Sequence, residues 1–219
     1  MKWTCKLKEL KELKEGKTMI KLGVLISGSG TNLQAIIDAI AAGTLDARVV
    51  LVISSRADAY GLRRAIKAGI PTIGLSKEVY TDRVAADELI VKEMINAGAE
   101  YLVMAGYMRM VGAPILEAFR DRVINIHPAL LPSFAGAHGI SDAYNAGVKV
   151  TGVTVHFANE AYDQGPIIAQ QALEIREGES LESLEARIHA IEHRIYPATL
   201  QLIAEGRVTI THDRKVSIA

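Results

Sequence analysis

An amide and an imidazole stand close together in the stretch NIHPALLPSFAGAHG, residues 125–139. The apolar residues just before them are typical of a buried strand, and alternate side chains of a strand point to the same face. Asn125 and His127 should therefore share a face, while Ile126 points to the other. The following proline ends the strand because it has no N–H to donate. The pattern predicts two polar side chains at a strand end, beneath an irregular loop.

A carboxylate that can join this pair lies in NEAYDQGP, residues 159–166, where Asp163 stands close to a glycine and a proline. An amide, an imidazole and a carboxylate together suit transfer of an acyl group to an amine. The amide stabilises the developing oxyanion, the imidazole moves protons, and the carboxylate stabilises the imidazolium. No serine or cysteine nucleophile is needed when the substrate supplies the amine. Taken separately, each group also fits an ordinary strand end or a solvated turn.

A glycine-rich turn, SGSGTN at residues 27–32, follows the first apolar strand and precedes a helix. Backbone N–H groups and the dipole at a helix start attract anions, and the glycines allow a phosphate to approach closely. The dinucleotide pattern G-x-G-x-x-G is incomplete, because position 33 is leucine. The second strand also lacks the terminal carboxylate that would hold an NAD ribose. The turn favours a monophosphate, or is only a tight connection.

The segment HAIEH, residues 189–193, matches the inverted zinc-protease pattern H-x-x-E-H. A zinc site needs a third protein ligand and a water, and downstream only Glu205, His212 and Asp213 are available. A zinc protease would also leave the upstream part of the chain unexplained, so we expect no metal. The segment then belongs to an amphipathic helix, or presents Glu192 to a ligand pocket.

The elements that must position these residues alternate between apolar strands and amphipathic helices. Strands of near-continuous Val, Ile and Leu, separated by helices, indicate a parallel sheet covered on both faces. We predict an α/β fold: a doubly wound, mostly parallel, Rossmann-like sheet with helices on both faces and a C-terminal β-hairpin. The expected strands are near 21–27, 47–54, 71–75, 100–106 and 122–126, the helices near 32–43, 57–69, 81–98, 112–120 and 180–206, with β-rich stretches at 148–158 and 165–175 and the hairpin at 207–218.

Bulk composition describes an ordinary globular chain. Its 219 residues are 49% hydrophobic and 23% charged, with a formal net charge of +0, which does not favour a broad nucleic-acid or membrane surface. The single cysteine excludes a disulfide framework and agrees with a reducing cytoplasm. Residues 1–18 carry six lysines and three glutamates. We predict that they form an extension or tag, poorly ordered or a short helix, before a single catalytic domain at residues 19–219.

Six stretches together resemble the phosphoribosylglycinamide formyltransferase family: ISGSGTNLQAII, AGYMRMV, NIHPALLPSFAGAHG, VTGVTVHF, DQGPIIAQ and EHRIYP. The match runs in order from about residue 19 to the C-terminus. It implies a folate-dependent enzyme of purine synthesis, which transfers the formyl group of 10-formyltetrahydrofolate to the amine of 5-phosphoribosylglycinamide. The resemblance implies catalytic roles for Asn125, His127 and Asp163, ribonucleotide contacts at Gly30, Thr31, Asn32 and Glu192, and folate contacts at Arg83, Met108, Arg109, Met110, Val111 and Asn125.

The same resemblance implies that the loop leading to Asp163 closes over the pterin. We further expect a cytoplasmic monomer or homodimer that binds small molecules, with no nucleic acid, membrane or metal partner. Three residues depart from the family pattern. Ala129 stands where serine is usual, Ala135 where proline is usual, and Ile140 where a second histidine is common. None of them alters the proposed catalytic trio.

Two related enzymes and one unrelated class remain as alternatives. Formyltetrahydrofolate deformylase shares the Asn, His and Asp positions but uses water, and it normally carries an N-terminal regulatory domain. Methionyl-tRNA formyltransferase has a similar core but needs a C-terminal RNA-binding domain. A non-catalytic nucleotide-binding module would use the glycine turn alone, and would leave the three polar groups without a role.

Overall fold

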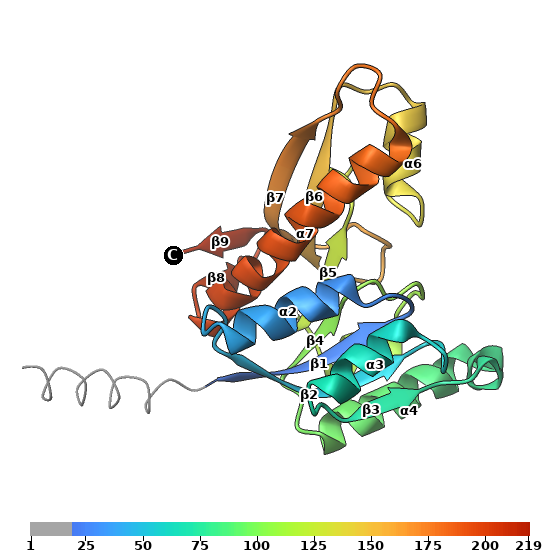
Figure 1. Cartoon of the computed structure of the whole chain (residues 1–219). Helices are drawn as coiled ribbons and strands as arrows, with labels where there is room; N and C mark the ends of the chain where they lie inside the picture. Colours follow the sequence, from blue (N-terminus) through green and yellow to red (C-terminus); the bar gives the residue numbers. More distant parts are fainter. Residues whose placement is uncertain (1–18) are drawn as a thin grey trace, which may run out of the picture.

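Seven strands of the described residues form one sheet in the order β3-β2-β1-β4-β5-β6-β7 (Figure 1). The computed structural model describes residues 19–219, so the predicted extension at residues 1–18, with Cys5, lies outside the described residues. β1 to β5 pair in parallel, whereas β6 is antiparallel to both of its neighbours. The strands are β1 (Ile20–Ile26), β2 (Ala47–Ser54), β3 (Thr72–Gly74), β4 (Tyr101–Met104), β5 (Val123–His127), β6 (Val150–Phe157) and β7 (Ile167–Glu174).

Helices cover both faces of this sheet, because its inner strands are apolar on both sides. In β1, Val24 and Ile26 belong to one buried cluster and Leu25 to another, as strand alternation requires. The first cluster includes residues of α2, α3 and α7, and the second includes residues of α4 and α5. The predicted doubly wound α/β fold is confirmed. The helices are α2 (Thr31–Ala41), α3 (Tyr60–Lys67), α4 (Arg83–Asn96), α5 (Ala113–Ala118), α6 (Gly139–Asn145) and α7 (Leu181–Ala204).

Most predicted boundaries agree with the structure to within a few residues. The Asp82 carboxylate accepts hydrogen bonds from the N–H groups of Val84 and Ala85, which caps α4 at the predicted start. The predicted C-terminal hairpin is present as β8 (Val208–Ile210) and β9 (Val216–Ile218). Two short elements, α6 and the 3₁₀ helix η1 (Lys77–Thr81), were not predicted. Among the described residues, no helix is both long and apolar enough to cross a membrane.

The strand order reverses between β1 and β4, which are neighbours in the sheet although two other strands separate them in sequence. In open α/β sheets, the chain ends leaving such a pair diverge to opposite faces and create a crevice at the carboxyl edge. Helix α7 is fixed to this edge by Tyr196, a fully buried residue whose hydroxyl lies 3.1 Å from the Met104 carbonyl and 3.0 Å from the Ile124 carbonyl. The fold thus supplies a crevice and a helix held beside it.

Candidate active site

A cavity of about 400 Å³ opens at the carboxyl edge of the sheet, at the reversal of strand order. Its walls come from segments that are distant in sequence but end at the same edge. They include the glycine turn after β1, the segment after β4, the end of β5 and one face of α7. The lining residues are Ser27–Asn32, Arg56, Met104–Met108, Asn125–Pro128, Gly136, Ala137, Tyr162, His189 and Glu192.

The three predicted catalytic side chains lie together at one end of this cavity. Asp163 Oδ2 is 3.3 Å from His127 Nδ1, and Asp163 Oδ1 accepts a hydrogen bond of 3.4 Å from Asn125 Nδ2. His127 and Asp163 are 3% and 6% exposed, so their interaction is little screened by water. The structure therefore brings an amide, an imidazole and a carboxylate into contact, as the strand-end pattern predicted. Their catalytic roles remain a prediction.

A fourth side chain, His156, joins this cluster and was missed by sequence reasoning. It lies directly opposite Asn125 in the antiparallel pairing of β5 with β6, and its Nε2 is 3.1 Å from Asn125 Nδ2. The same nitrogen is 3.6 Å from Asp163 Oδ1, while Nδ1 faces the Phe157 carbonyl at 2.9 Å. In its neutral form His156 accepts from Asn125, and in its charged form it donates toward Asp163. His156 thus orients the amide and the carboxylate.

The loop that carries Asp163 has little conformational freedom. Asp163 itself adopts a left-handed conformation with φ of 54°, a region that few non-glycine residues occupy. Two residues later, a Cβ on Gly165 would lie 1.7 Å from the Phe157 carbonyl oxygen, so only glycine fits there. The Gly136 N–H donates a 2.9 Å hydrogen bond to Asp163 Oδ2, which ties this loop to the one after β5. Together these constraints direct the carboxylate inward.

Opposing effects act on the protonation of Asp163. Burial raises the pKa of the carboxyl group, but hydrogen bonding from His156 and Gly136 and the positive charge of His127 outweigh burial, so the pKa lies below its usual value. Asp163 is therefore a carboxylate at neutral pH. It can stabilise a positive charge on either neighbouring imidazole.

Both ring nitrogens of His127 face acceptors. Nε2 lies 2.8 Å from the Phe134 carbonyl, which can only accept, so this nitrogen carries a hydrogen. Nδ1 faces the Asp163 carboxylate, and protonation of both nitrogens would satisfy both acceptors. Proton transfer from Nε2 to a substrate would require the hydrogen bond to Phe134 to break, so substrate binding must rearrange the resting contacts.

The predicted phosphate turn forms the opposite wall of the cavity. Gly30 precedes α2 with φ of 70°, and a Cβ there would lie 2.6 Å from the Cα of Gly61, so glycine is required on both counts. Thr31 and Asn32 then begin the helix, whose first N–H groups lack intrahelical partners. Unpaired N–H groups of this kind can bind an anion, and binding of the ribonucleotide phosphate here stays a prediction.

Glu192 of α7 closes this wall, where the sequence analysis expected a ligand-facing carboxylate. It is only 4% exposed, and its Oε2 accepts from Asn32 Nδ2 at 3.1 Å and from His189 Nδ1 at 2.8 Å. The Asn32 Oδ1 atom is buried and has no hydrogen-bond partner within residues 19–219. An unsatisfied acceptor of this kind is costly, and a hydroxyl or N–H of a ligand would satisfy it.

His189 is a further cavity-lining residue that the sequence analysis considered only as part of a zinc motif. The hydrogen bond from its ring to Glu192 raises the pKa of His189, and burial only partly offsets this effect. Burial instead lowers the pKa of His193, whose ring stacks on that of His189 at 6.5 Å. Within the described part of the chain, no group of three or more His, Cys, Asp and Glu side chains could hold a metal ion. Because its pKa is raised, His189 presents a partly charged imidazole to the cavity.

Asn125, His127, Asp163 and His156 form a group that we call the catalytic cluster for its predicted role. The predicted folate-contacting residues lie beside this cluster in two smaller crevices. Arg83, Met108, Arg109 and Met110 line one of about 230 Å³, and Met110, Val111 and Asn125 help to line the other. The second crevice also contains His156 and Asp163, so it reaches the catalytic cluster. Met108 and Met110 are 66% and 49% exposed, which leaves apolar surface available to a flat ring system.

Three contacts that the sequence did not indicate hold this region. The buried Asp87 carboxylate accepts a 2.6 Å hydrogen bond from the Gly112 N–H, and burial raises the pKa of Asp87. The Tyr80 and Tyr107 hydroxyls are 3.0 Å apart, and the Arg109 guanidinium lies 4.1 Å from the centre of the Tyr80 ring. Tyr107 lines the main cavity, whereas His138 is absent from the lining of that cavity.

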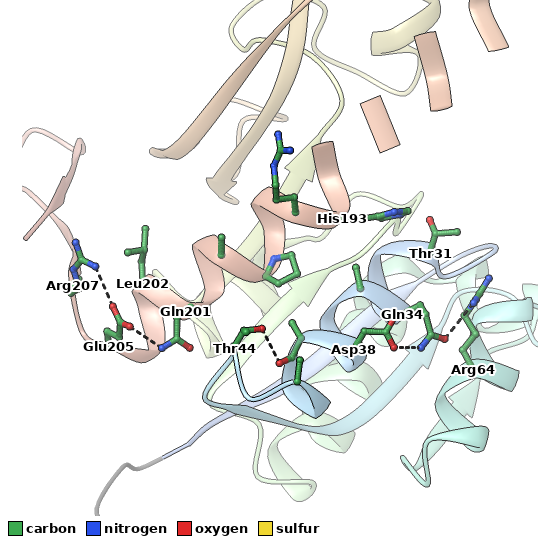
Figure 2. A pocket seen from close by; sticks show the side chains of 16 residues that line it. Thr31, Gln34, Asp38, Thr44, Arg64, His193, Gln201, Leu202, Glu205 and Arg207 are labelled. Atoms are coloured by element: carbon green, nitrogen blue, oxygen red, sulfur yellow. Dashed lines mark hydrogen bonds and ion pairs between the residues drawn. The ribbon is translucent and has the colours of Figure 1, made fainter. Parts of the chain in front are cut away.

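A second and larger hollow, a groove of about 860 Å³, runs between α2 and the C-terminal half of α7 (Figure 2). Its polar side chains contact one another: Gln34 bonds to Asp38 and Arg64, and Gln201 bonds to Glu205. Between them lie small apolar residues such as Ala35, Ala39 and Ala198. The groove contains none of the residues of the catalytic cluster.

Comparison with known proteins agrees with this geometry. A family model described as formyl transferase matches residues 20–200. Phosphoribosylglycinamide formyltransferase of Bacillus subtilis is 39% identical, over 84% of this chain and 94% of its own length. The crystal structure of glycinamide ribonucleotide transformylase 1 from Symbiobacterium toebii has a TM-score of 0.88 and 49% identity, and covers 91% of this chain and 94% of that one.

Longer relatives match as well. The trifunctional purine biosynthetic protein adenosine-3 of Gallus gallus is 41% identical over 90% of this chain, but the match spans only 20% of that protein. The chain thus corresponds to about a fifth of such a relative and to nearly the whole of the bacterial one. On the strength of the family model and the full-length bacterial match, the chain belongs to the formyl transferase family.

Proposed function

We propose that this protein transfers the formyl group of 10-formyltetrahydrofolate to the amine of 5-phosphoribosylglycinamide, a step of purine synthesis. The observation that carries the proposal is the buried cluster of Asn125, His127, Asp163 and His156, which adjoins the cavity containing the glycine turn and a crevice lined by methionines. The family membership and the names of the full-length bacterial relatives support the same reaction.

The two substrates would enter from opposite sides of the cluster. The phosphate of the ribonucleotide would bind the N–H groups at Gly30, Thr31 and Asn32, and its ribose hydroxyls would contact Glu192. The folate would lie along Arg83 and residues 108–111, with the loop before Asp163 closing over its pterin ring. Asn125 lines both the cavity and the adjoining crevice, so the amine and the formyl carbon would meet beside its amide.

In the proposed reaction, the amine attacks the formyl carbon and the bond from that carbon to N10 of the folate breaks. The Asn125 amide and the His127 imidazolium would stabilise the oxyanion of the tetrahedral intermediate. One proton leaves the attacking nitrogen and one reaches N10, with His127 acting in the transfer. Asp163 would hold the positive charge on His127, and a positioned proton donor of this kind typically contributes about 10²–10⁴-fold to the rate.

A coupled assay tests the proposal. The purified protein is mixed with 10-formyltetrahydrofolate, and folate absorbance is followed with and without the ribonucleotide. Formation of tetrahydrofolate that depends on the ribonucleotide is expected. Turnover of the same rate without the ribonucleotide would indicate a deformylase, and nucleotide binding without any turnover would indicate a non-catalytic module.

We also propose that the protein acts in the cytoplasm as a monomer or homodimer and binds only small molecules. The composition supports this proposal, since the net charge is zero and the chain has a single cysteine. Chromatography with light scattering would give the mass in solution and distinguish the two oligomeric states.

A further inference from the structure

The catalytic cluster alone does not determine which nucleophile reacts. An amide, an imidazole and a carboxylate can stabilise attack by a water molecule as well as attack by an amine. In hydrolysis, a water oxygen would bond to the formyl carbon and the bond from that carbon to N10 would break. N10 would take one proton, and formate would leave while a second proton passed to solvent. A transferase therefore needs a structural feature that keeps water from the formyl carbon.

The residue in a position to do this is Tyr162. Among the described residues, Met104, Asn125 and Tyr162 line both the main cavity and the crevice that reaches Asp163. Met104 is 5% exposed and belongs to the core, and Asn125 is part of the catalytic cluster. Tyr162 alone among these three is a large exposed side chain, at 42%. It stands where the two hollows meet, at the boundary with solvent.

The backbone of the loop determines this position. Asp163, the next residue, has φ of 54° and points its carboxylate inward, where the Gly136 N–H and His127 contact it. Gly165 cannot carry a side chain, because the Phe157 carbonyl occupies that space. Since the loop is constrained on its C-terminal side, the residue before the buried aspartate lies at the mouth of the site. Glu160, two residues earlier on the same loop, lines the crevice but not the main cavity.

The aromatic ring, rather than the hydroxyl, carries the expected effect. The Tyr162 hydroxyl makes no hydrogen bond to any other residue of the described range 19–219. Burial, followed by the charge of Asp163, raises the pKa of this phenol, so Tyr162 is neutral at physiological pH. A neutral ring where the two hollows meet would cover the formyl carbon with apolar surface, which offers water no hydrogen-bond partner.

We infer that the Tyr162 ring excludes water from the junction of the two substrate sites and so selects the amine over hydrolysis. The inference rests on the proposed function, since it concerns the acceptor of that same formyl group. It assigns specificity between two nucleophiles to a side chain outside the catalytic cluster.

The test is the ratio of donor hydrolysis without ribonucleotide to transfer with ribonucleotide, measured for wild type, Tyr162→Ala, Tyr162→Phe and Glu160→Ala. Formate release and formylated product are quantified separately. We expect Tyr162→Ala to raise the ratio by about tenfold or more, the scale on which a reshaped pocket alters discrimination. Tyr162→Phe keeps the ring, and Glu160→Ala removes a carboxylate that lines the crevice but not the junction of the two hollows, so both should keep the wild-type ratio.

An unchanged ratio in Tyr162→Ala would overturn the inference. An equal rise in Glu160→Ala would also overturn it, because it would point to general loosening of the loop, and an equal rise in Tyr162→Phe would assign the effect to the hydroxyl. Failure of the proposed function gives a different signature: wild type itself would hydrolyse the donor without needing the ribonucleotide. Melting temperatures of all four proteins establish that each is folded.

Discussion

The groove between α2 and α7 is larger than the cavity at the carboxyl edge of the sheet, but the more deeply buried polar groups lie at the cavity. The groove between α2 and α7 is about 860 Å³, while the cavity beside the catalytic cluster is about 400 Å³. In the groove, polar side chains bond to one another at the surface, as Arg207 does to Glu205 (Figure 2). His127 and Glu192, which line the cavity, and Asp163, which contacts His127, are each less than a tenth exposed. Burying such groups costs free energy, so they identify a functional site better than volume does.

Removing the buried charges at the cavity should have the largest effect on activity. We expect Asp163→Asn and His127→Ala each to lower the turnover number by at least about 100-fold, the lower end of what positioned proton transfer supplies. The folded state should persist in both, which circular dichroism would check. Steady-state kinetics of the formyl transfer measures the loss. Turnover close to that of wild type in either variant would remove that residue from the mechanism.

A change of one methyl group should test how far the cavity depends on its supporting loop. Gly165→Ala places a Cβ 1.7 Å from the Phe157 carbonyl, so the loop must shift. We expect a loss of about 1–3 kcal/mol in the free energy of unfolding, as for other overpacked sites. Activity should fall as well, because Asp163 is two residues away. Urea denaturation and the formyl transfer assay would detect the two effects. A variant with wild-type stability would mean that the loop can adopt another backbone conformation that accommodates the Cβ.

The charge on His189 should produce a smaller, pH-dependent effect. Its raised pKa means that the imidazolium persists to a higher pH than in a free imidazole, and is lost as the pH rises through that raised pKa. A cation beside the phosphate turn favours an anionic substrate, so the KM for the ribonucleotide should rise from about pH 7 to pH 9. The rise should be about fivefold at most, because an exposed ion pair contributes up to about 1 kcal/mol.

The matched control for this prediction is His189→Gln, which keeps a polar side chain without the charge. Its KM for the ribonucleotide should be almost independent of pH over the same range. The KM for the folate should not change in either protein. The same pH dependence in both proteins would assign the effect to another titrating group, such as the amine of the substrate, because α-amino groups have pKa values of about 7.7–8.0.

The smallest effect is expected in the larger hollow. Arg194 lines the groove and is exposed. Arg194→Ala should leave the turnover number and both KM values within error, and should change the free energy of unfolding by less than about 0.5 kcal/mol. A loss of activity comparable to that of the cavity variants would show that the groove takes part in function. Burial of polar groups would then not distinguish the functional hollow from the other.

Sequence reasoning predicted the strands and the shared face of Asn125 and His127, because both follow from local patterns. Asn125 and His127 lie two residues apart, and strand alternation is enough to place them on one face. His156 could not be found in this way, because its position opposite Asn125 depends on the antiparallel pairing of β5 with β6. Strand direction and register involve residues far apart in sequence, and neither was predicted for β6.

Two other gaps have local causes. Helix α6 is seven residues long and begins with a glycine, so its sequence gives only a weak helical signal. His189 was considered only as a metal ligand, although its partner is Glu192, three residues later on the same helix. Helical spacing of i and i+3 would have indicated that contact. Which face of α7 borders the cavity, however, depends on packing against the sheet.

Tyr196 has a consequence for how the two ends of the reaction are aligned. Its hydroxyl is anchored to the strand carbonyl immediately before Asn125, and it lies one turn along α7 from Glu192. The group that would bind the sugar and the group that would contact the transferred carbon are therefore connected through this phenol, in addition to the apolar packing of α7 on the sheet. An acceptor with a longer or shorter distance between its sugar and its amine would therefore require this anchor to move.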